Sequence, residues 1–525
     1  MSYVTKGNAL LNAGKPAEAC EQYAKAVEAD PQSTAAYYNW GLALSRDMGR
    51  YAEACEKFAK AAEIAPQFAE AHYNWGLALA RLDRYSEACE RFAKAVELDP
   101  GHADAYANWG TALSYMGRHA EAMEKCLKAI EVSPQHAAAY HGWGLALAQA
   151  GRRIEACEKF AKAVELDTRD AGACYNWGIE LHALGRHAEA REKYAKAAEI
   201  NPQFANAYCN WAAALIMLGR PAEACEMAAK ATEIDPQYAM AYYNWGNALL
   251  RMGRHAETCE KCAMAVELAP RLADAYVTWG GALRNLGRFA EACEKHAKAV
   301  EIDPQSANAY TGWGVALEGL GRYAEACEKH AKAIEISPRL GLAHFNWGVS
   351  LHNLGRHAEA CEHYGTATEI NPHYAEAYVN WGVALRSLGR DAEACEKFAK
   401  AAELNPHWAE AYFNWGNALG SLRRDAEACE KYAKAAELSP QWAEAYDAWA
   451  WELGALDRFA EACEQCSKAV AINPQFAHAY FVWGVALAHM GQFSEALEKL
   501  SIAEELDPEL RPRIEEMRKD LLGTE

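Results

Sequence analysis

The chain has 525 residues, of which 51% are hydrophobic and 24% are charged, and its formal net charge at pH 7 is −19. The length exceeds the size at which one globular core stops growing, and the composition excludes a disordered chain. A charge of this sign repels phosphate backbones and anionic bilayers, so the sequence argues against nucleic acid or a membrane surface as the main partner.

A tryptophan recurs at a fixed interval along the chain. It stands at Trp40 and Trp75, and from there it returns every 34 residues to Trp483. A period of this size is typical of one supersecondary unit that is stacked many times. In such a stack each unit touches only its neighbours, so we expect one long binding surface and no single deep core pocket.

Each unit reads as two helices. In the repeat that begins near residue 239, Tyr242, Trp245 and Leu249 recur at helical spacing and predict the first helix. Gly253 then supplies a left-handed helix end. A second pattern of small and aromatic residues, such as Ala394 followed by Phe398, predicts a second helix that packs closely on the first.

The two ends of the array differ from its middle. The first unit has Lys6 where the tryptophan belongs, and the second unit carries one extra residue within 45–49, which we expect to be absorbed in its turn. After Pro508, apolar residues at helical spacing among many charges predict an amphipathic helix that covers the last repeat.

The unit resembles the tetratricopeptide repeat, a 34-residue helix–turn–helix with a large-x2-Leu-Gly-x2-Tyr signature. Here Tyr242-x2-Trp245-Gly246-x2-Leu249 keeps the spacing but has Trp in place of the signature's Leu, and Leu in place of its Tyr. The resemblance implies an all-α fold: a right-handed α-solenoid superhelix of about 15 repeats over residues 1–508, followed by a C-terminal capping helix over 509–525.

Twelve of the 17 cysteines occupy one column of the repeat. Equivalent residues of stacked helices lie about 9–10 Å apart, whereas a disulfide needs Cα atoms within about 7 Å. The column therefore predicts free thiols in a reducing compartment. The N-terminal residues lack the layout of a signal peptide, and no apolar run approaches the length of a membrane span. We predict a cytoplasmic protein.

The sequence shows no motif for catalysis. It contains no phosphate-binding glycine loop, no Gly-x-Ser-x-Gly and no His-Glu-x-x-His, so we predict that the chain is not an enzyme and needs no cofactor. Two Cys-x-x-Cys pairs occur, at Cys259/Cys262 and Cys463/Cys466, with His255 near the first. Zinc requires four ligands around one point, and the repeat spacing spreads these residues apart, so we expect substitutions in a core column and no metal site.

In tetratricopeptide repeats, the face of the first helix that points away from the second lines a concave groove. An asparagine column occupies that face immediately before the tryptophans, and it resembles the asparagine ladder of O-GlcNAc transferase, which holds the amide backbone of extended peptides. An asparagine amide matches a peptide group's own donor and acceptor. The alternative is that asparagine is the family's common residue here, without a dedicated role. The column consists of Asn39, Asn74, Asn108, Asn176, Asn210, Asn244, Asn346, Asn380 and Asn414.

An aromatic column stands two residues before the tryptophans and points toward the same groove. If it is exposed, it marks a binding strip; the alternative is that neighbouring first helices bury it. In the middle repeats a further groove position is charged, with Arg284 and Arg386 as candidate specificity residues. The aromatic column consists of Tyr38, Tyr73, Tyr175, Tyr243, Phe345, Phe413 and Phe481.

These patterns favour one function over two alternatives. We predict a protein–protein interaction scaffold that binds a peptide or protein segment in the concave groove of the superhelix. One alternative is a self-assembling structural protein, which would be a homo-oligomer. The other is a regulatory or recruiting subunit of an enzyme whose catalytic domain lies on another chain.

Overall fold

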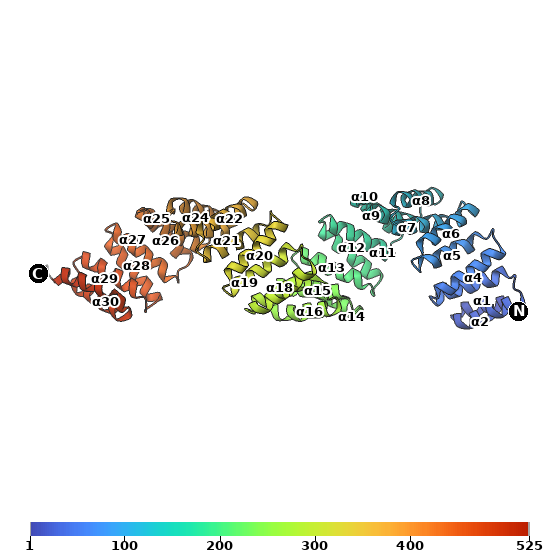
Figure 1. The fold of residues 1–525 in the computed structure, drawn as a ribbon, viewed down its shortest axis with the longest axis horizontal. Helices are drawn as coiled ribbons and strands as arrows, with labels where there is room; N and C mark the ends of the chain where they lie inside the picture. The colour runs from blue at the N-terminus through green and yellow to red at the C-terminus, as the bar shows by residue number, and fades with distance from the viewer. Residues whose placement is uncertain (1, 523–525) are drawn as a thin grey trace. The chain divides into compact units, whose positions relative to one another are not determined.

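The computed structural model describes residues 2–522, so residues 523–525 of the predicted capping helix lie outside the described residues. The chain divides into two compact units after Pro270. Each unit is a stack of antiparallel helix pairs, as the ribbon in Figure 1 shows, so the predicted all-α helix–turn–helix architecture is confirmed.

Unit 1 contains eight helix pairs. The first helices are α1 (Tyr3–Asn12), α3 (Thr34–Leu42), α5 (Ala69–Ala80), α7 (Ala103–Tyr115), α9 (Ala137–Gln149), α11 (Ala171–Ala183), α13 (Ala205–Met217) and α15 (Ala239–Arg251). The second helices are α2 (Pro16–Ala29), α4 (Tyr51–Ile64), α6 (Tyr85–Leu98), α8 (His119–Val132), α10 (Arg153–Leu166), α12 (His187–Ile200), α14 (Pro221–Ile234) and α16 (His255–Leu268).

Unit 2 contains seven helix pairs and a terminal helix. The first helices are α17 (Ala273–Asn285), α19 (Ala307–Gly319), α21 (Gly341–Asn353), α23 (Ala375–Ser387), α25 (Ala409–Ser421), α27 (Ala443–Ala455) and α29 (Ala477–His489). The second helices are α18 (Phe289–Ile302), α20 (Tyr323–Ile336), α22 (His357–Ile370), α24 (Asp391–Leu404), α26 (Asp425–Leu438), α28 (Phe459–Ile472) and α30 (Phe493–Leu506), and a 3-10 turn, η2 (Pro508–Leu510), leads to α31 (Arg511–Leu522).

The turn inside each pair depends on a residue with positive φ. Gly253 has φ +73°, a conformation that glycine adopts without steric cost, so the predicted helix end is confirmed there. Three repeats lack this glycine, and Asp83, Arg423 and Asp457 hold φ values of 57°, 58° and 57° in its place. The left-handed turn is therefore kept even where the residue type disfavours it.

The glycine that follows most of the column tryptophans lets the two helices of a pair approach closely. A Cβ atom added at Gly41 would lie 2.7 Å from the ring of Phe58, and one added at Gly76 would lie 2.7 Å from the ring of Phe92. Both rings are completely buried. The bulky aromatic on the second helix fills the space that the missing side chain leaves open, which gives each repeat a close-packed core.

The tryptophans connect successive repeats. The ammonium of Lys57, on the second helix of the same repeat, lies 4.3 Å from the ring centroid of Trp40, and Lys193 lies 3.9 Å from that of Trp177. The thiol of Cys20 in the preceding repeat donates to Met48 Sδ of the second repeat at 3.8 Å. Burial raises the pKa of that thiol, which keeps it protonated and unreactive. The cysteine column thus contributes to the contact between repeats.

The extra residue of the second repeat lies in the helix and not in the turn that follows. Residues Ala43–Asp47 form a π-helical turn, η1, at the end of α3, and Gly49 then adopts φ +67°. The N–H of Arg50 donates to the Leu44 carbonyl at 2.8 Å, so the backbone remains hydrogen-bonded across the insertion. A widened turn absorbs one residue and leaves the repeats on either side in place.

The amphipathic end of the chain packs on the last repeat. Ile514 of α31 is completely buried with Leu500 and Phe481, and Leu510 is nearly so. Arg518 forms an ion pair of 2.7 Å with Glu504 on α30. The apolar side of α31 therefore shields the core of the final helix pair.

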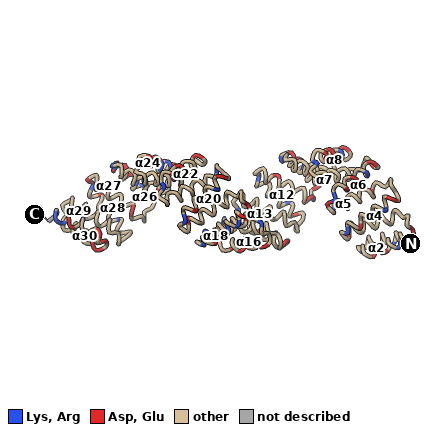
Figure 2. Tube along the Cα trace, viewed as in Figure 1, with Lys and Arg blue, Asp and Glu red and all other residues tan. Residues whose placement is uncertain are grey.

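The charged residues are distributed along the whole chain, as Figure 2 shows. Many form exposed pairs three residues apart at the start of the second helices, such as Arg84 with Glu87 and Arg118 with Glu121. Exposed pairs of this kind add little to stability. Within residues 2–522, no helix is both long and apolar enough to cross a membrane.

Candidate functional site: the inner face of the first helices

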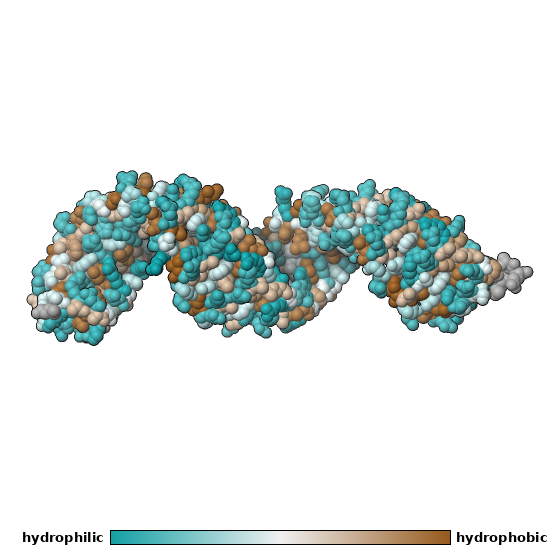
Figure 3. All heavy atoms as spheres, turned by 180° about the vertical axis from the view of Figure 1, so that it is seen from behind, coloured by the Kyte–Doolittle hydropathy of each residue, from teal (hydrophilic) through white to brown (hydrophobic). Residues whose placement is uncertain are grey.

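We call the side of the first helices that points away from their own second helices the inner face. Within each unit, successive first helices contact one another, as α7 does α9 and α27 does α29, whereas successive second helices in the described residues stay farther apart. Because the first helices lie closer together than the second helices, each unit curves, and its inner face is on the concave side. The surface in Figure 3 is hydrophilic over most of the visible side, with smaller apolar groups between.

The asparagine column lies on this face but differs in exposure from repeat to repeat. Asn74, Asn244 and Asn346 are buried, with 4%, 6% and 8% of their surface exposed. The remaining six are half-buried: Asn39, Asn108, Asn176, Asn210, Asn380 and Asn414. Only these six present part of their amide to solvent as the structure stands.

In unit 1 the asparagine amides hydrogen-bond the preceding repeat. Asn74 Nδ2 donates to the Tyr38 hydroxyl at 3.1 Å, and Asn210 Nδ2 donates to the Tyr175 hydroxyl at 3.1 Å. An offset of 35 residues joins Asn108 to Tyr73, Asn176 to His141 and Asn244 to the Cys209 carbonyl, and Asn39 bonds to Asn8, 31 residues earlier. Sequence analysis did not identify this role, although the paired Asn and Tyr columns were the available signal.

In unit 2 the pattern is different. Asn380 Nδ2 donates to the Glu376 carbonyl at 2.9 Å and Asn414 Nδ2 to the Glu410 carbonyl at 3.1 Å, both within their own helix. An amide has two N–H donors and one carbonyl acceptor. Because the hydrogen bonds of Asn380 and Asn414 use the amide nitrogen, their Oδ1 atoms are the groups best placed to accept a hydrogen bond from a ligand.

The aromatic column fills the junctions between repeats. The Tyr38 ring lies 4.8 Å from that of Phe68 and 6.0 Å from that of Phe58, so it joins its own second helix to the start of the next repeat. Phe481 is buried, and the Arg513 guanidinium of α31 lies 4.6 Å from its ring. Tyr73, Tyr175, Phe345 and Phe413 make the same pair of ring contacts as Tyr38, and Tyr243 is half-buried like them.

The two predicted specificity arginines are both half-buried. Arg284 Nε donates to Asn285 Oδ1 at 3.3 Å, and Arg386 Nε lies 3.5 Å from Asp391 Oδ1. The charge of Arg284 also affects a buried histidine of the core, His296. Burial and the nearby Arg284 lower the pKa of His296 to about 4.

Two adjoining hollows open on the inner face of unit 1. The first, of about 270 Å³, lies over η1 and α5, and the second, of about 400 Å³, lies over α5 and α7. Leu77 and Arg81 line both, so the two form one continuous depression across three repeats. Asn74 lines the first and Asn108 the second, which brings two members of the asparagine column into this site.

Beyond α7 the inner face closes. A Cβ atom added at Gly142 on α9 would lie 3.0 Å from Thr111 Oγ1 and 3.1 Å from Cys126 Sγ, because α9 packs directly on α7. Ala107 takes the place of the column aromatic there and is buried. The break in the asparagine column at Gly142 therefore has a structural cause, which is close helix packing.

Unit 2 has a third hollow, of about 220 Å³, over α27 and α29. Its lining is mainly apolar and includes Val482 and Val485, and the Trp451 side chain at its edge is 45% exposed. Beside it, His478 Nδ1 lies 2.8 Å from Asp447 Oδ2. Sequence analysis did not predict this site; the additional tryptophan at 451 and the loss of the asparagine column at 482 were its signals.

One chain of polar groups on the inner face has the form of a proton relay. His141 Nδ1 lies 2.8 Å from Asp170 Oδ2, and Asn176 Nδ2 lies 3.0 Å from His141 Nε2. Burial alone would raise the pKa of Asp170, but hydrogen bonds from His141 and from the backbone hold that pKa below its usual value. The contacts of both ring nitrogens fix the imidazole. This arrangement stabilises the junction of α9 and α11.

The described residues contain no group of three or more His, Cys, Asp or Glu side chains that could hold a metal ion. Cys259 is half-buried, whereas Cys262, three residues later, is fully buried, and burial raises the pKa of Cys262 to about 12. A thiol in that state is a poor metal ligand because binding requires the thiolate.

Profiles of the tetratricopeptide repeat match several parts of the chain. Profiles described as "Tetratricopeptide repeat" match residues 4–69, 69–102, 103–136, 205–238, 341–374 and 375–408, and one described as "TPR repeat" matches 178–219. The chain belongs to the tetratricopeptide-repeat family.

Comparison with solved tetratricopeptide-repeat structures gives distant matches. The Cut9 structure of the APC/C hetero-tetramer Cut9-Hcn1 is 17% identical, covers 92% of this chain and 95% of its own, and gives a TM-score of 0.42. Yeast Tom70 is 15% identical, covers 75% and 97%, and gives 0.38. YrrB, described as a TPR protein with an unusual peptide-binding site, is 27% identical, covers 36% and 96%, and gives 0.30. A search of curated proteins gives no significant match.

Proposed function

We propose that this tetratricopeptide-repeat protein is a cytoplasmic, non-catalytic scaffold that binds an extended segment of another protein along its inner face. The observation that carries the proposal is the continuous depression formed by the two hollows of unit 1. It crosses three repeats, so its shape suits an extended chain better than a compact small molecule. Repeat proteins of this family commonly bind protein partners on such surfaces.

The lining of the depression suits a peptide. Leu77 and Ala80 provide apolar surface, and Asn108 and Thr111 provide polar groups at its second end. Tyr115 is 57% exposed and stacks on Tyr85 with their ring centroids 5.0 Å apart. An exposed, rigid aromatic pair beside polar groups is the composition that binding sites for protein segments favour. In unit 2, Asn380 and Asn414 offer their Oδ1 atoms in the same way.

The thiols support the proposed compartment. All 17 cysteines are free, and the column cysteines hydrogen-bond or pack against the next repeat as thiols. Burial raises the pKa of Cys55 and Cys89 to about 11. A chain that uses so many buried thiols in its core is suited to a reducing compartment.

The test is peptide selection against the full-length chain. Peptides of about twelve residues would be selected from a random library, and their dissociation constants measured for the wild type and for Tyr115→Ala. Truncating a central interface tyrosine commonly costs about tenfold or more in affinity. The control is Ile154→Ala, because Ile154 on α10 is 64% exposed but lines no hollow of the inner face. Equal affinity of the wild type and Tyr115→Ala for all selected peptides would refute binding at this site.

A second function, self-association, has one observation in its favour. A leucine recurs at the end of the first helices of unit 2 and stays exposed in five successive repeats. Rows of exposed apolar side chains mark interaction surfaces. Sedimentation across a wide concentration range tests this, since a constant monomer mass excludes it. The exposed fractions are 41% for Leu286, 39% for Leu320, 40% for Leu354, 38% for Leu388 and 37% for Leu422.

A further inference from the structure

The first hollow of unit 1 differs from the rest of the inner face in its charge. Arg46 and Arg81 line it, together with the uncharged side chains of Ser45, Tyr51, Asn74, Leu77 and Ala78. No acidic residue is among these seven. The chain has a net charge of −19, so a hollow lined by two cationic side chains and no anionic one is unusual. Such a local positive charge favours an anionic ligand.

The arginines of this hollow also differ from those at the turns. Arg50, Arg84 and Arg118 each hold the glutamate three residues later through both Nε and Nη2. Within residues 2–522, by contrast, neither Arg46 nor Arg81 lies within ion-pair distance of a carboxylate. Their guanidinium donors are therefore available to a ligand in a way that the turn arginines are not.

The extra residue of the second repeat creates this arrangement. It lies in the π-helical turn η1, and that turn carries Ser45 and Arg46 over the inner face of α5. π-Helical turns inside α-helices frequently occur at functional sites. This turn is the one π-helical turn of the described residues, and it is the element that brings Arg46 to the hollow lined by Arg81.

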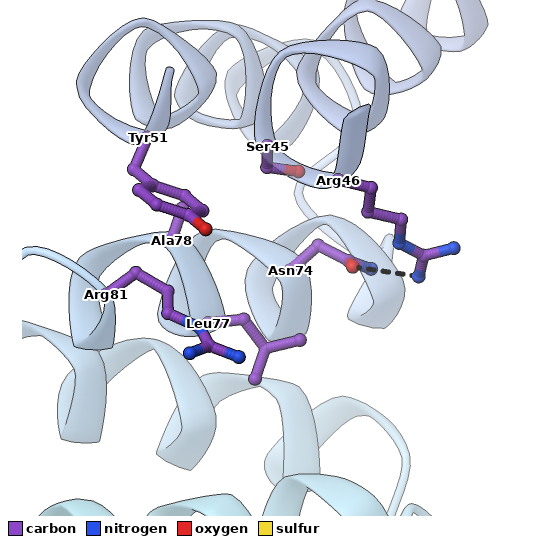
Figure 4. A pocket seen from close by; sticks show the side chains of 7 residues that line it. All are labelled: Ser45, Arg46, Tyr51, Asn74, Leu77, Ala78 and Arg81. Atoms are coloured by element: carbon purple, nitrogen blue, oxygen red, sulfur yellow. Dashed lines mark hydrogen bonds between the residues drawn. The ribbon is translucent and has the colours of Figure 1, made fainter. Parts of the chain in front are cut away.

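Figure 4 shows how the groups are held. Arg46 and Arg81 lie on opposite sides of Asn74 and Leu77, and the Tyr51 ring reaches in from α4. Asn74 Nδ2 donates to the Glu70 carbonyl at 2.9 Å, which turns its Oδ1 toward Arg46 Nη2 at 3.5 Å. The amide thereby orients one guanidinium.

One acidic side chain, Glu70, contacts Asn74 from outside the lining of this hollow. Glu70 Oε2 lies 3.5 Å from Asn74 Nδ2, on the nitrogen side of the amide, and Glu70 does not line the hollow. The Ser45 hydroxyl donates to the Leu42 carbonyl at 3.2 Å. The ligand donors that remain are the two guanidinium groups and the Tyr51 hydroxyl, which come from η1, α5 and α4.

We propose that this hollow binds a phosphate monoester carried by the protein segment that lies on the inner face. The donors that line the hollow come from three elements, and a phosphate dianion offers them three terminal oxygens, one more than a carboxylate does. The hollow continues through Leu77 and Arg81 into the second hollow, so the rest of the segment has a place to lie. This inference rests on the proposed function and adds the chemistry of its ligand.

The test uses three peptide libraries on the full-length chain. Each library has twelve random-sequence residues around one fixed central residue, which is phosphoserine, serine or glutamate. At near-physiological salt, the wild type should bind the phosphoserine library at least about tenfold more tightly than the other two. Arg46→Gln and Arg81→Gln should each reduce that preference to about twofold or less, because each removes one charged donor pair.

The control variant is Arg118→Gln, which removes an exposed arginine already paired with Glu121 and should keep the preference. Thermal unfolding should be the same for all three variants, since Arg46, Arg81 and Arg118 are all exposed. Inorganic phosphate is the second probe. It should compete at least about a hundredfold more weakly than phosphoserine peptides, because the segment contributes its own contacts.

The outcomes separate the two proposals. Equal binding of the phosphoserine and serine libraries overturns the phosphate site but leaves inner-face binding intact. Equal binding of phosphoserine and glutamate overturns the phosphate chemistry, and a preference that survives both arginine variants overturns the location. Inorganic phosphate that binds as tightly as the peptides overturns the protein segment as the carrier. If no library binds, the proposed function fails as well.

Discussion

Several repeats of unit 1 and two repeats of unit 2 differ at the position that packs against the glycine after the tryptophan. In unit 1, Phe58, Phe92 and Phe160 occupy it, whereas α18 and α20 of unit 2 carry His296 and His330 there. The rings fill the same space. A Cβ atom at Gly280 would lie 2.6 Å from His296 Nε2, much as one at Gly76 would lie 2.7 Å from the Phe92 ring. In these repeats the position holds a flat ring of that size.

The chemistry of the two rings is not equivalent. Both nitrogens of His296 are buried without a hydrogen-bond partner in the described residues, whereas His330 Nε2 lies 3.1 Å from Glu318 Oε1. A buried polar atom without a partner costs free energy that a phenyl ring does not. The comparison shows that the stack selects its core residues by shape, and that unit 2 tolerates a less stable and pH-sensitive choice.

Removing a ring in unit 1 should have the largest effect. We expect Phe92→Ala to lower the free energy of unfolding by about 3–5 kcal/mol, because it leaves a cavity in a rigid core. In a one-dimensional stack the loss should stay near α5–α7. Hydrogen exchange should therefore rise in those helices while α17–α20 keep their protection. A uniform loss of protection across both units would contradict the local character of the cores.

Acid should destabilise unit 2 through His296. Its pKa is about 4 in the folded chain, below the value of about 6.5 for an unfolded histidine, so the unfolded state binds the proton more readily. This group therefore leaves the free energy of unfolding unchanged above about pH 6.5. As the pH drops from about 6.5 to 4, the free energy of unfolding falls by about 3 kcal/mol because of His296.

The matched variant is His296→Phe, which restores the ring found in unit 1. Chemical unfolding at several pH values should show a shallower acid dependence for the variant than for the wild type. At pH 7 the variant should also be more stable by about 1–2 kcal/mol, since two unpaired nitrogens are gone. Identical pH profiles for the two proteins would show that the imidazole of His296 is solvated.

The smallest effect compares the asparagines of the two units. Asn210→Ala removes a hydrogen bond to Tyr175 in the preceding repeat and should cost about 1 kcal/mol. Asn414→Ala removes only a bond to its own helix and should cost less. Thermal unfolding of the two variants side by side measures the difference. Equal losses would mean that the contact between repeats adds nothing at this position.

Much of the fold follows from the sequence because each repeat contains the residues that specify its own two helices and the turn between them. The 34-residue period, the helical spacing of Tyr242, Trp245 and Leu249, and Gly253 at the turn predict two helices and their ends. These are local properties that depend on a few adjacent residues. The prediction failed only in detail, where η1 and not the turn absorbs the extra residue.

The site was less accessible to sequence analysis. The sequence placed Asn74 and Asn210 on the inner face, but their exposure and hydrogen bonds depend on Tyr38 and Tyr175 in the preceding repeats. Likewise, the hollow around Arg46 exists because η1 and α5 meet across a repeat boundary. The sequence by itself determined the family, the helices and the repeating core. Only tertiary packing decided which polar groups remain available to a ligand, because burial is set by neighbours about 35 residues away.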